Sequence, residues 1–426
     1  MKNKLEQQQE TLRNLIPLIK NIAGSDDQLN DLNIHGDYFI LGAGKASVQM
    51  AEAVIDQLGY EPVDGIIITN QEDTVMGNLQ IFKGSHPLPD ELSVSASYEL
   101  METARAIPAG SSVIFCLSGG ASAMLTIPPD GIEIDELADT HSILLNSGAS
   151  IHEMNTVRKH LCMLKGGQLA QILHHTELTT LLISDVPGDD PEVIGSGPTI
   201  CDSSTFKDAF QVLKRYSLWE KVPHSVRIHI AKGMGGDIPD TPKPGVNEHP
   251  SHTVELISDA GKLANRIGEE LKEQGYHVQV ADSAYNDELK AVSKKICTET
   301  ISVLNGHGKL EKPAALVFFG ESMVNVSGSG KGGRNQEMAL TIALSLEGQH
   351  PVSVLSIGTD GLDGPTDAAG AIVTSNTTLE ARKQKVEPEK YLQNNDSYHF
   401  HETMGTLIKT RPTGNNLMDL QVLLIG

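Results

Sequence analysis

The chain has 426 residues, of which 39% are hydrophobic and 21% are charged, and its formal net charge is −22. This length and composition predict a globular protein with two domains, because 426 residues exceed one ordinary hydrophobic core. The negative charge argues against nucleic acid or an anionic membrane surface as a partner, since both would repel the chain. An anionic small molecule is still compatible with a local cluster of cations and backbone amides.

The first ten residues are too polar for a signal peptide, and no apolar run approaches the length of a membrane span. The four cysteines, Cys116, Cys162, Cys201 and Cys297, lie far apart and form no C-x-x-C pair. This usage is typical of buried thiols in a reducing compartment. We therefore expect a cytoplasmic protein, either a monomer or a homodimer.

An apolar stripe predicts a helix over residues 5–23. The first predicted strand, residues 37–41, runs into a glycine turn with Gly44 and Lys45, and a helix follows. Lys45 at the helix start can meet an anion, although a solvated lysine explains it equally well. The turn is not a dinucleotide fingerprint, because Ser47 stands in place of the third glycine.

The same pattern returns at residues 112–117, a buried strand that ends in Ser118, Gly119 and Gly120 ahead of a short helix. Strands followed by glycine turns and helices predict a mostly parallel sheet. In such a sheet, ligands gather at the carboxyl ends of the strands.

A cationic helix or turn is predicted within residues 155–170, where a solvated basic face is the alternative interpretation. The next buried strand, residues 180–184, delivers Asp185, and a Pro/Gly-rich loop presents Asp189 and Asp190. Carboxylates at this place suit a Mg²⁺ ion that bridges nucleotide phosphates. Ordinary turn chemistry accounts for the same residues.

Residues 235–251 contain four prolines and little apolar content, so we place the domain boundary there. The prediction is a Rossmann-like three-layer α/β domain over residues 1–240 with a mostly parallel sheet. A second α/β domain is predicted over residues 250–426.

The second domain contains a buried strand at residues 315–319, then Glu321, a glycine-rich loop at 328–333 and a helix that begins near Arg334. Free loop amides and the positive end of the helix dipole predict an anion-binding site. The loop is neither a dinucleotide fingerprint, since it does not directly follow the strand, nor a P-loop, since no Ser or Thr follows its lysine.

Another predicted strand, residues 352–357, ends in a glycine loop that carries Asp360, Asp363 and Asp367. The spacing is not that of a twelve-residue calcium loop.

Together these segments resemble the class II glycerate kinases, or glycerate 2-kinases, whose carboxyl-terminal domain is called MOFRL. The resemblance rests on six motifs in order: LGAGKAS at 41–47, LSGGASAML at 117–125, NTVRKHL with KGGQLA at 155–170, ISDVPGD with GSGPT at 183–199, GKGGRNQE at 330–337 and GTDGLDGPTDAAGA at 358–371.

The resemblance implies transfer of a phosphoryl group from ATP to D-glycerate with Mg²⁺, usually giving 2-phosphoglycerate. It also implies an active site in a cleft between two α/β domains, with a MOFRL region at about residues 314–424. Lys45 and Arg334 match the essential cationic pair of that family.

Residue roles follow from this resemblance and from the chemistry of phosphoryl transfer, which needs alignment and charge neutralisation. The expected catalytic residues are Lys45, Arg334, Asp189 and Asp360. The expected substrate- and phosphate-binding residues are Gly44, Ser118, Gly119, Gly120, Asn155, Arg158, Lys165, Gly332, Gly333 and Asn335. The expected metal ligands are Asp185, Glu321 and Asp363, and the division of base and metal roles among the acids stays open.

Two other classes of protein are weighed against the kinase. A nicotinamide-dependent hydroxypyruvate reductase would need a complete fingerprint with its ribose-binding acid, which the turn at Gly44 lacks. A non-catalytic sensor of sugar acids or nucleotides would need fewer charged groups at its strand ends.

Overall fold

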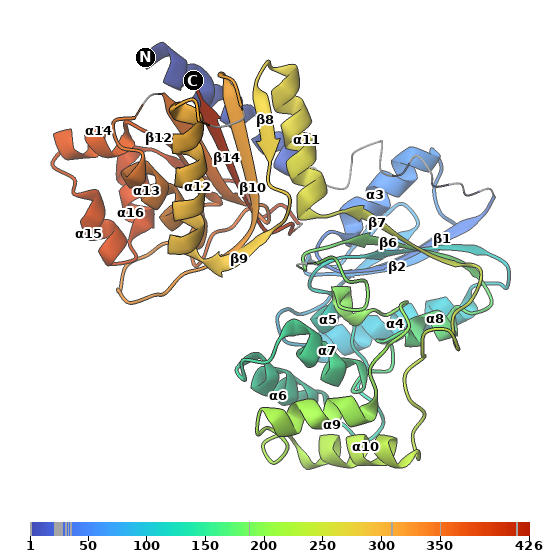
Figure 1. Cartoon of the computed structure of the whole chain (residues 1–426). Helices are drawn as coiled ribbons and strands as arrows, with labels where there is room; N and C mark the ends of the chain where they lie inside the picture. The colour runs from blue at the N-terminus through green and yellow to red at the C-terminus, as the bar shows by residue number, and fades with distance from the viewer. Residues whose placement is uncertain are drawn as a thin grey trace. The chain divides into compact units, whose positions relative to one another are not determined.

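The computed structural model describes residues 2–20, 29, 32, 34, 36–186, 188–307, 310–349, 351–414 and 416–426. The chain forms two compact units, each with its own sheet (Figure 1). We call residues Ala23–Ile257 the N-terminal unit, and Met1–Ile22 together with Ser258–Gly426 the C-terminal unit.

The N-terminal unit is built on a seven-stranded sheet of order β3-β4-β2-β1-β5-β6-β7. Five neighbouring strands are parallel, and β3 is antiparallel to β4. The strands are β1 (Tyr38–Ala43), β2 (Asp64–Thr69), β3 (Thr74–Met76), β4 (Leu79–Lys83), β5 (Ser112–Leu117), β6 (Glu177–Ile183) and β7 (His252–Ser258). The central strands are apolar throughout because helices cover both faces of the sheet.

Helix α3 covers one face of this sheet, and α4 and α8 lie on the other (Figure 1). A further layer contains α6, α7, α9 and α10, which enclose a core of their own that includes Leu137, Val157 and Phe206. The helices are α3 (Ser47–Leu58), α4 (Glu91–Ala106), α5 (Ala121–Met124), α6 (Ile134–Leu145), α7 (Ile151–Lys159), α8 (Gln168–Ile172), η2 (Ile194–Ser196), α9 (Phe206–Arg215) and α10 (His224–Gly235). The predicted layered α/β domain with a mostly parallel sheet is confirmed.

The C-terminal unit contains a sheet of order β13-β12-β11-β14-β10-β8, with β9 also paired to β10. Its strands are β8 (His277–Val280), β9 (Tyr285–Glu288), β10 (Ala314–Met323), β11 (Val352–Gly358), β12 (Gly370–Thr374), β13 (Leu407–Ile408) and β14 (Asp419–Ile425). Strand β14 is antiparallel to both of its neighbours, β10 and β11. It therefore begins at the edge of the sheet where β10 and β11 end.

Helices pack on this sheet through apolar residues such as Ile296 and Ile342, which contact strand residues such as Leu316 and Leu423. The helices are α11 (Ala260–Glu273), α12 (Leu289–Leu304), α13 (Arg334–Ser345), α14 (Thr377–Lys383), α15 (Pro388–Gln393) and α16 (Ser397–Met404).

The predicted N-terminal domain, residues 1–240, is wrong at its start. The predicted helix over residues 5–23 forms as α1 (Lys2–Asn14) and α2 (Ile16–Lys20), and its residues 21–23 lie outside the described residues. Helix α1 packs against β11 and β12 of the C-terminal unit, and the Ser353 hydroxyl donates to Gln8 Oε1 at 3.0 Å. An apolar stripe predicts that a helix packs on a core, but it does not specify which core.

The predicted boundary at residues 235–251 is also wrong, because this proline-rich stretch packs on the N-terminal unit. The Asp202 N–H donates to Pro242 O at 2.7 Å, and Thr241 Oγ1 donates to Asp202 Oδ2 at 2.9 Å. The next strand, β7, then joins the N-terminal sheet beside β6. Prolines lack an N–H but their carbonyls still accept, so a proline-rich stretch is not necessarily a linker.

The placement of α1 predicts a local effect of shortening Leu12, which is fully buried. Leu12→Ala should lower the free energy of unfolding of the C-terminal unit by about 2–5 kcal/mol, because the cavity cannot fully collapse. Hydrogen exchange should then speed up in β11 and β12 while β1 is unchanged.

The matched control is Gln7→Ala on the exposed face of the same helix, which should change stability by less than about 0.5 kcal/mol. Faster exchange in β1 with none in β11 would contradict the assignment of α1 to the C-terminal unit.

Candidate active site

In the N-terminal unit, the turns that follow β1 and β5 bond to each other. The Lys45 N–H donates to Gly119 O at 3.0 Å, and the Ala46 N–H donates to Ser118 Oγ at 3.0 Å. The Ser118 N–H donates back to Ala43 O at 3.1 Å. The two strands are neighbours in the sheet, so the predicted residues of both turns are brought together.

Two glycines in these turns are required by the closeness of neighbouring groups. Gly44 has a φ of +126°, and a Cβ on it would lie 2.4 Å from Ser118 Oγ. A Cβ on Gly119 would lie 2.0 Å from Asp185 Oδ2. The Asp185 carboxylate at the end of β6 therefore lies directly against the Gly119 backbone.

The side chains of two cations of this unit, Lys45 and Arg158, have no hydrogen-bond or ion-pair partner among the residues that the structure describes. Arg158 on α7 is only 7% exposed, and burial lowers the pKa of its guanidinium to about 10. A buried charge without a partner is costly, so a guanidinium in this state is suited to an anion from outside the chain.

His86 lies beside these cations and was not predicted from the sequence. A Cβ on Gly120 would lie 3.3 Å from His86 Cδ2 and 3.4 Å from Lys45 Cγ. Partial burial and the nearby charges of Lys45 and Arg158 lower the pKa of His86 to about 4. The imidazole is thus neutral at pH 7, and no motif in the sequence marks it.

Lys165 and Asn155, predicted to bind substrate, are instead used by the protein itself. The Lys165 amine is fully buried and donates to Leu125 O at 2.7 Å, Thr126 Oγ1 at 2.6 Å and Cys162 Sγ at 3.3 Å. Asn155 is 1% exposed, and its Nδ2 donates to Val193 O at 2.9 Å. Burial lowers the pKa of Lys165, and its three acceptors stabilise the chain around it.

Asp189 lies in the loop that follows Asp185 and has a φ of 53°, an unusual value for a residue with a side chain. Its N–H donates to Val186 O at 3.1 Å. Its catalytic role stays a prediction.

In the C-terminal unit, Arg334 is the first residue of α13 and lies between two carboxylates. Its Nε is 2.6 Å from Asp419 Oδ2, and its Nη1 donates to Glu321 Oε1. Burial alone would lower the pKa of Arg334, but Asp419 and Glu321 raise it above its usual value. The arginine is therefore permanently charged and held in one place.

Asp419 is a site residue that the sequence analysis missed. It is 1% exposed, and the Asn335 amide donates to its Oδ1 at 2.8 Å. Burial raises the pKa of Asp419 to about 7, although Arg334 and Asn335 lower it in part. Nothing in the sequence distinguishes it from an ordinary residue at the start of a strand.

Part of the glycine-rich loop bonds to the protein itself, and the anion-binding role predicted for Gly332 and Gly333 stays a prediction. The Ser327 and Gly328 N–H groups both donate to Asn395 Oδ1 at 2.9 Å, and the Lys331 N–H donates to Asp396 Oδ1 at 2.9 Å. A Cβ on Gly328 would lie 2.2 Å from Asn394 O. Glycine is needed here for close packing of the chain against itself.

The start of α13 is likewise capped by Asp363, which was predicted to bind metal. Its two carboxylate oxygens accept from the Asn335 N–H at 2.9 Å and the Gln336 N–H at 2.8 Å. Asp363 is 2% exposed and caps the helix, and its predicted role as a metal ligand stays a prediction. Glu321, also predicted as a ligand, is paired with Arg334.

Among the described residues, no group of three or more His, Cys, Asp or Glu side chains could hold a metal ion. This finding is compatible with Mg²⁺, because Mg²⁺ is commonly held by one or two carboxylates with substrate phosphates and water. Asp185 and Asp360, each half-buried at the end of a strand, are carboxylates of the kind it uses.

Arg334 and Asp360 line a pocket of about 620 Å³ in the C-terminal unit, together with Gly332, Gly333 and Asp363. Its apolar wall is formed by Val324, Val326, Leu362 and Pro365. A pocket with one fixed cation and an apolar wall can bind a ligand that is anionic at one end and apolar at the other.

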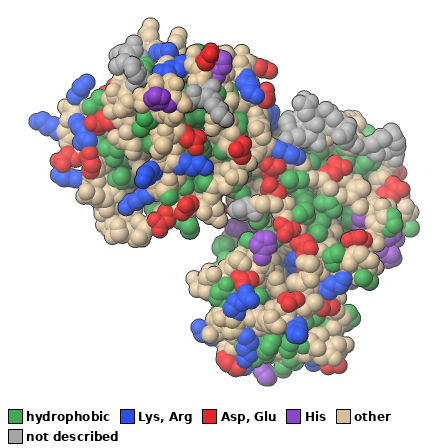
Figure 2. Space-filling model, viewed as in Figure 1, with side chains coloured by type: hydrophobic (Ala, Val, Ile, Leu, Met, Phe, Trp, Pro, Cys, Tyr) green, Lys and Arg blue, Asp and Glu red, His purple; other side chains and the backbone are tan. Residues whose placement is uncertain are grey.

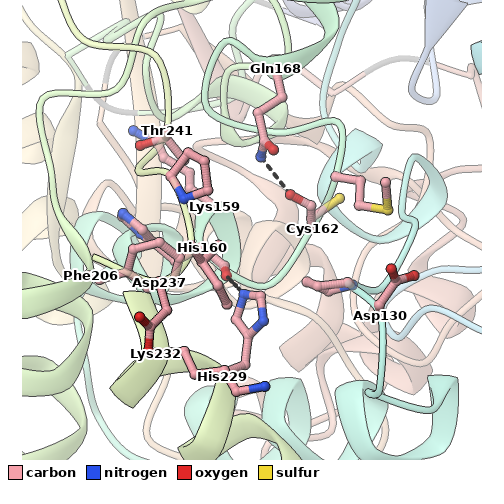
Figure 3. Close-up of a pocket in the computed structure, with 14 residues that line it drawn as sticks. Asp130, Lys159, His160, Cys162, Gln168, Phe206, His229, Lys232, Asp237 and Thr241 are labelled. Atoms are coloured by element: carbon pink, nitrogen blue, oxygen red, sulfur yellow. Dashed lines mark hydrogen bonds between the residues drawn. The ribbon is translucent and has the colours of Figure 1, made fainter. Parts of the chain in front are cut away.

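A second pocket, of about 530 Å³, lies in the helical layer of the N-terminal unit (Figure 3). Two of the side chains that line it already have partners: Lys159 Nζ is 3.2 Å from Asp202 Oδ1, and His160 Nε2 is 2.9 Å from Asp240 Oδ1. The Arg158 side chain, by contrast, has no such partner among the described residues, so we assign no ligand to this second pocket.

On the face shown in Figure 2, Lys and Arg side chains are interspersed with Asp and Glu on both units. This pattern is unlike the continuous basic stripe that follows a nucleic-acid backbone. None of the helices that the structure describes is long and apolar enough to span a membrane.

The fold defines a two-domain α/β protein, and the unpaired side chains of Lys45 and Arg158 are suited to a small anion. Residues 1–231 match a family model described as a domain of unknown function (DUF4147), and residues 314–419 match the MOFRL family. The D-glycerate 2-kinase of Thermotoga maritima is 37% identical and covers 91% of this chain and 90% of its own length. The glycerate 2-kinase of Pyrococcus horikoshii is 35% identical, and the alignment covers 96% of this chain and 92% of that protein.

A putative hydroxypyruvate reductase of Agrobacterium vitis is also similar, at 33% identity over 92% of this chain and 88% of its own length. The crystal structure of a glycerate kinase from Thermotoga maritima matches with a TM-score of 0.87 at 35% identity, covering 98% of this chain and all of that one. The chain thus belongs to the class II glycerate kinase family.

Arg158 and Lys165 are both buried cations, but only the Lys165 side chain has hydrogen-bond partners among the described residues, so we expect opposite effects on stability when each charge is removed. Arg158→Met should leave the free energy of unfolding within about 0.5 kcal/mol of the native value, or raise it, because a costly unpaired charge is lost. Lys165→Met should lower it by about 1–3 kcal/mol, because buried acceptors lose their donor. Urea denaturation measures both.

Stabilisation by inorganic phosphate gives a second measurement for Arg158→Met and Lys165→Met. The stabilisation of the protein by phosphate should disappear in Arg158→Met and persist in Lys165→Met. Equal destabilisation by the two variants, with phosphate stabilisation intact in both, would contradict an anion-binding role for Arg158.

Proposed function

We propose that this protein catalyses ATP-dependent phosphorylation of D-glycerate at its 2-hydroxyl group, giving 2-phospho-D-glycerate and ADP. The observation that carries the proposal is the pair Lys45 and Arg158, two cations without an acidic partner among the described residues, beside glycine turns at the strand ends. Both substrates are anions, and relatives that align over nine tenths of this chain are glycerate 2-kinases by name.

Lys45 and Arg334 neutralise charge on the transferring phosphoryl group and on the glycerate carboxylate in this proposal. Phosphoryl transfer requires little covalent chemistry from a protein, so alignment and electrostatic stabilisation supply most of the catalysis. Arg158 adds a guanidinium whose fork fits a carboxylate or a phosphate. Closure of the protein around its substrates would exclude water, which otherwise competes with glycerate as the phosphoryl acceptor.

An aspartate accepts the proton of the glycerate hydroxyl. Asp189 and Asp360 are assigned to this duty or to metal binding, since both lie on loops at strand ends. When bound with the nucleotide, Mg²⁺ would offset the charge of the phosphates, and Asp185 of the N-terminal unit or Asp360 of the C-terminal unit would hold it.

The remaining assignments concern the whole protein. Four free cysteines among the described residues and the net charge of −22 support a cytoplasmic protein without a nucleic-acid partner. We propose a monomer or a homodimer.

The reaction can be tested by incubating the protein with D-glycerate, ATP and Mg²⁺ and observing the products by phosphorus NMR. The expected product is a phosphate ester coupled to one proton, which identifies the 2-position. Addition of EDTA should abolish turnover and excess Mg²⁺ should restore it. Oxidation of NADH by hydroxypyruvate without ADP formation would favour the reductase instead.

Lys45→Met should reduce kcat/KM for D-glycerate by about 100-fold or more, because one preorganised charge is lost. The matched control is Lys331→Met: Lys331 Nζ lies 4.2 Å from the centre of the Tyr398 ring and is not assigned to the site. Steady-state kinetics should show the control within about threefold of the native enzyme, a change of under 1 kcal/mol. Equal losses in both variants would contradict a specific role for Lys45.

A further inference from the structure

Asp419 occupies a position that the topology of the C-terminal sheet makes unusual. It is the first residue of β14 and lies opposite Gly320 of β10 and Gly358 of β11. Both neighbours are glycines, so neither contributes a side chain beside it. Its carboxylate is nevertheless 1% exposed, because the start of α13 covers it with Arg334 and Asn335.

The two residues that contact Asp419 are consecutive in the chain, and one of them is fixed further. Asn335 donates to Asp419 Oδ1 at 2.8 Å, while its own Oδ1 accepts from Ser356 Oγ at 2.9 Å and Gln421 Nε2 at 3.3 Å. One oxygen of the carboxylate is therefore held by a buried amide network. The other, Oδ2, accepts no hydrogen bond from the described residues and lies 2.6 Å from Arg334 Nε as an ion pair.

The two acids that contact Arg334 differ in burial. The Asp419 side chain is 1% exposed, whereas that of Glu321 is 47% exposed. A ligand anion can displace the solvated Glu321 from the guanidinium at small cost, because an exposed ion pair contributes little. The ion pair between Asp419 and Arg334 stays in place, because the buried Asp419 carboxylate cannot be solvated by water if the pair breaks.

We propose that Asp419 is a positioning residue that holds the Nε edge of Arg334, so that the terminal nitrogens of the guanidinium face the substrate anion in the pocket. The proposal rests on the proposed function of Arg334 in glycerate phosphorylation. Arg334 lines the pocket together with Asp360 and Gly333, so that its terminal nitrogens can meet a phosphoryl group there once the anion displaces Glu321.

The charged groups around Asp419 give this role a pH dependence. Burial and Asp363 raise its pKa, Arg334 and Asn335 lower it, and the result is about 7. Tyr285 and Glu321 complete the set of titratable groups near it. Because the ionised carboxylate is the form that pairs with Arg334, the pair weakens as the pH falls through about 7.

Asp419→Asn is the direct test, because asparagine keeps the shape and an acceptor for Asn335 but removes the charge. It should reduce kcat by about 10- to 100-fold with little change in KM, since a misplaced catalytic group costs turnover. The fall in kcat of the native enzyme on the acid side of pH 7 should be absent in this variant. Glu389→Gln, which changes an exposed acid paired with Arg382 outside the site, should alter kcat by less than about threefold.

Arg334→Lys, measured alone and combined with Asp419→Asn, separates this proposal from the proposed function. If Arg334→Lys is as slow as the double variant, the two residues act through one arrangement, as expected. If Arg334→Lys loses turnover but Asp419→Asn keeps native kcat and its acid limb, the positioning role is wrong. A lower melting temperature with native kcat would also overturn it. If Arg334→Lys itself keeps native turnover, the proposed function of Arg334 fails instead.

Discussion

The cost of a buried charge is the constraint that sorts the ionic groups of this protein. Lys165 is fully buried and has three acceptors around its amine. Lys159 pairs with two acids, and Arg334 is held between two more. Arg158 is buried to a similar degree without any partner in the described part of the chain. Because folding does not favour such a group by itself, a role in binding an external anion explains it best.

Both glycine-rich settings pack closely against the protein itself. Gly119 leaves room for the Asp185 carboxylate, and Gly328 leaves room for the backbone of Asn394. The backbone amides of both settings also bond to the protein. The cations beside them differ, because the Lys45 side chain has no hydrogen-bond or ion-pair partner among the described residues, whereas Lys331 Nζ lies over the Tyr398 ring. The sequence does not show this difference, since both lysines stand in glycine-rich loops ahead of a helix.

The sequence predicted the architecture and part of the candidate site. Apolar strands followed by glycine turns indicated a mostly parallel sheet, and neighbouring strand ends indeed bring Lys45, Ser118 and Gly119 together. The packing of α1 on the C-terminal unit could not be predicted, because a stripe of apolar residues fits any apolar surface. His86 could not be predicted either, since its position depends on contacts and not on a motif.

Asp419 shows most clearly why a rule about strand ends is incomplete. The prediction looked for ligand-binding residues where strands finish, as β10 and β11 do at this edge. The insertion of an antiparallel strand between them brings the beginning of β14 to the same edge. A residue that the chain places more than eighty positions after Arg334 thereby becomes its buried acid partner. In a mixed sheet, the residues that start antiparallel strands therefore have to be considered with those that end parallel ones, because both reach one edge.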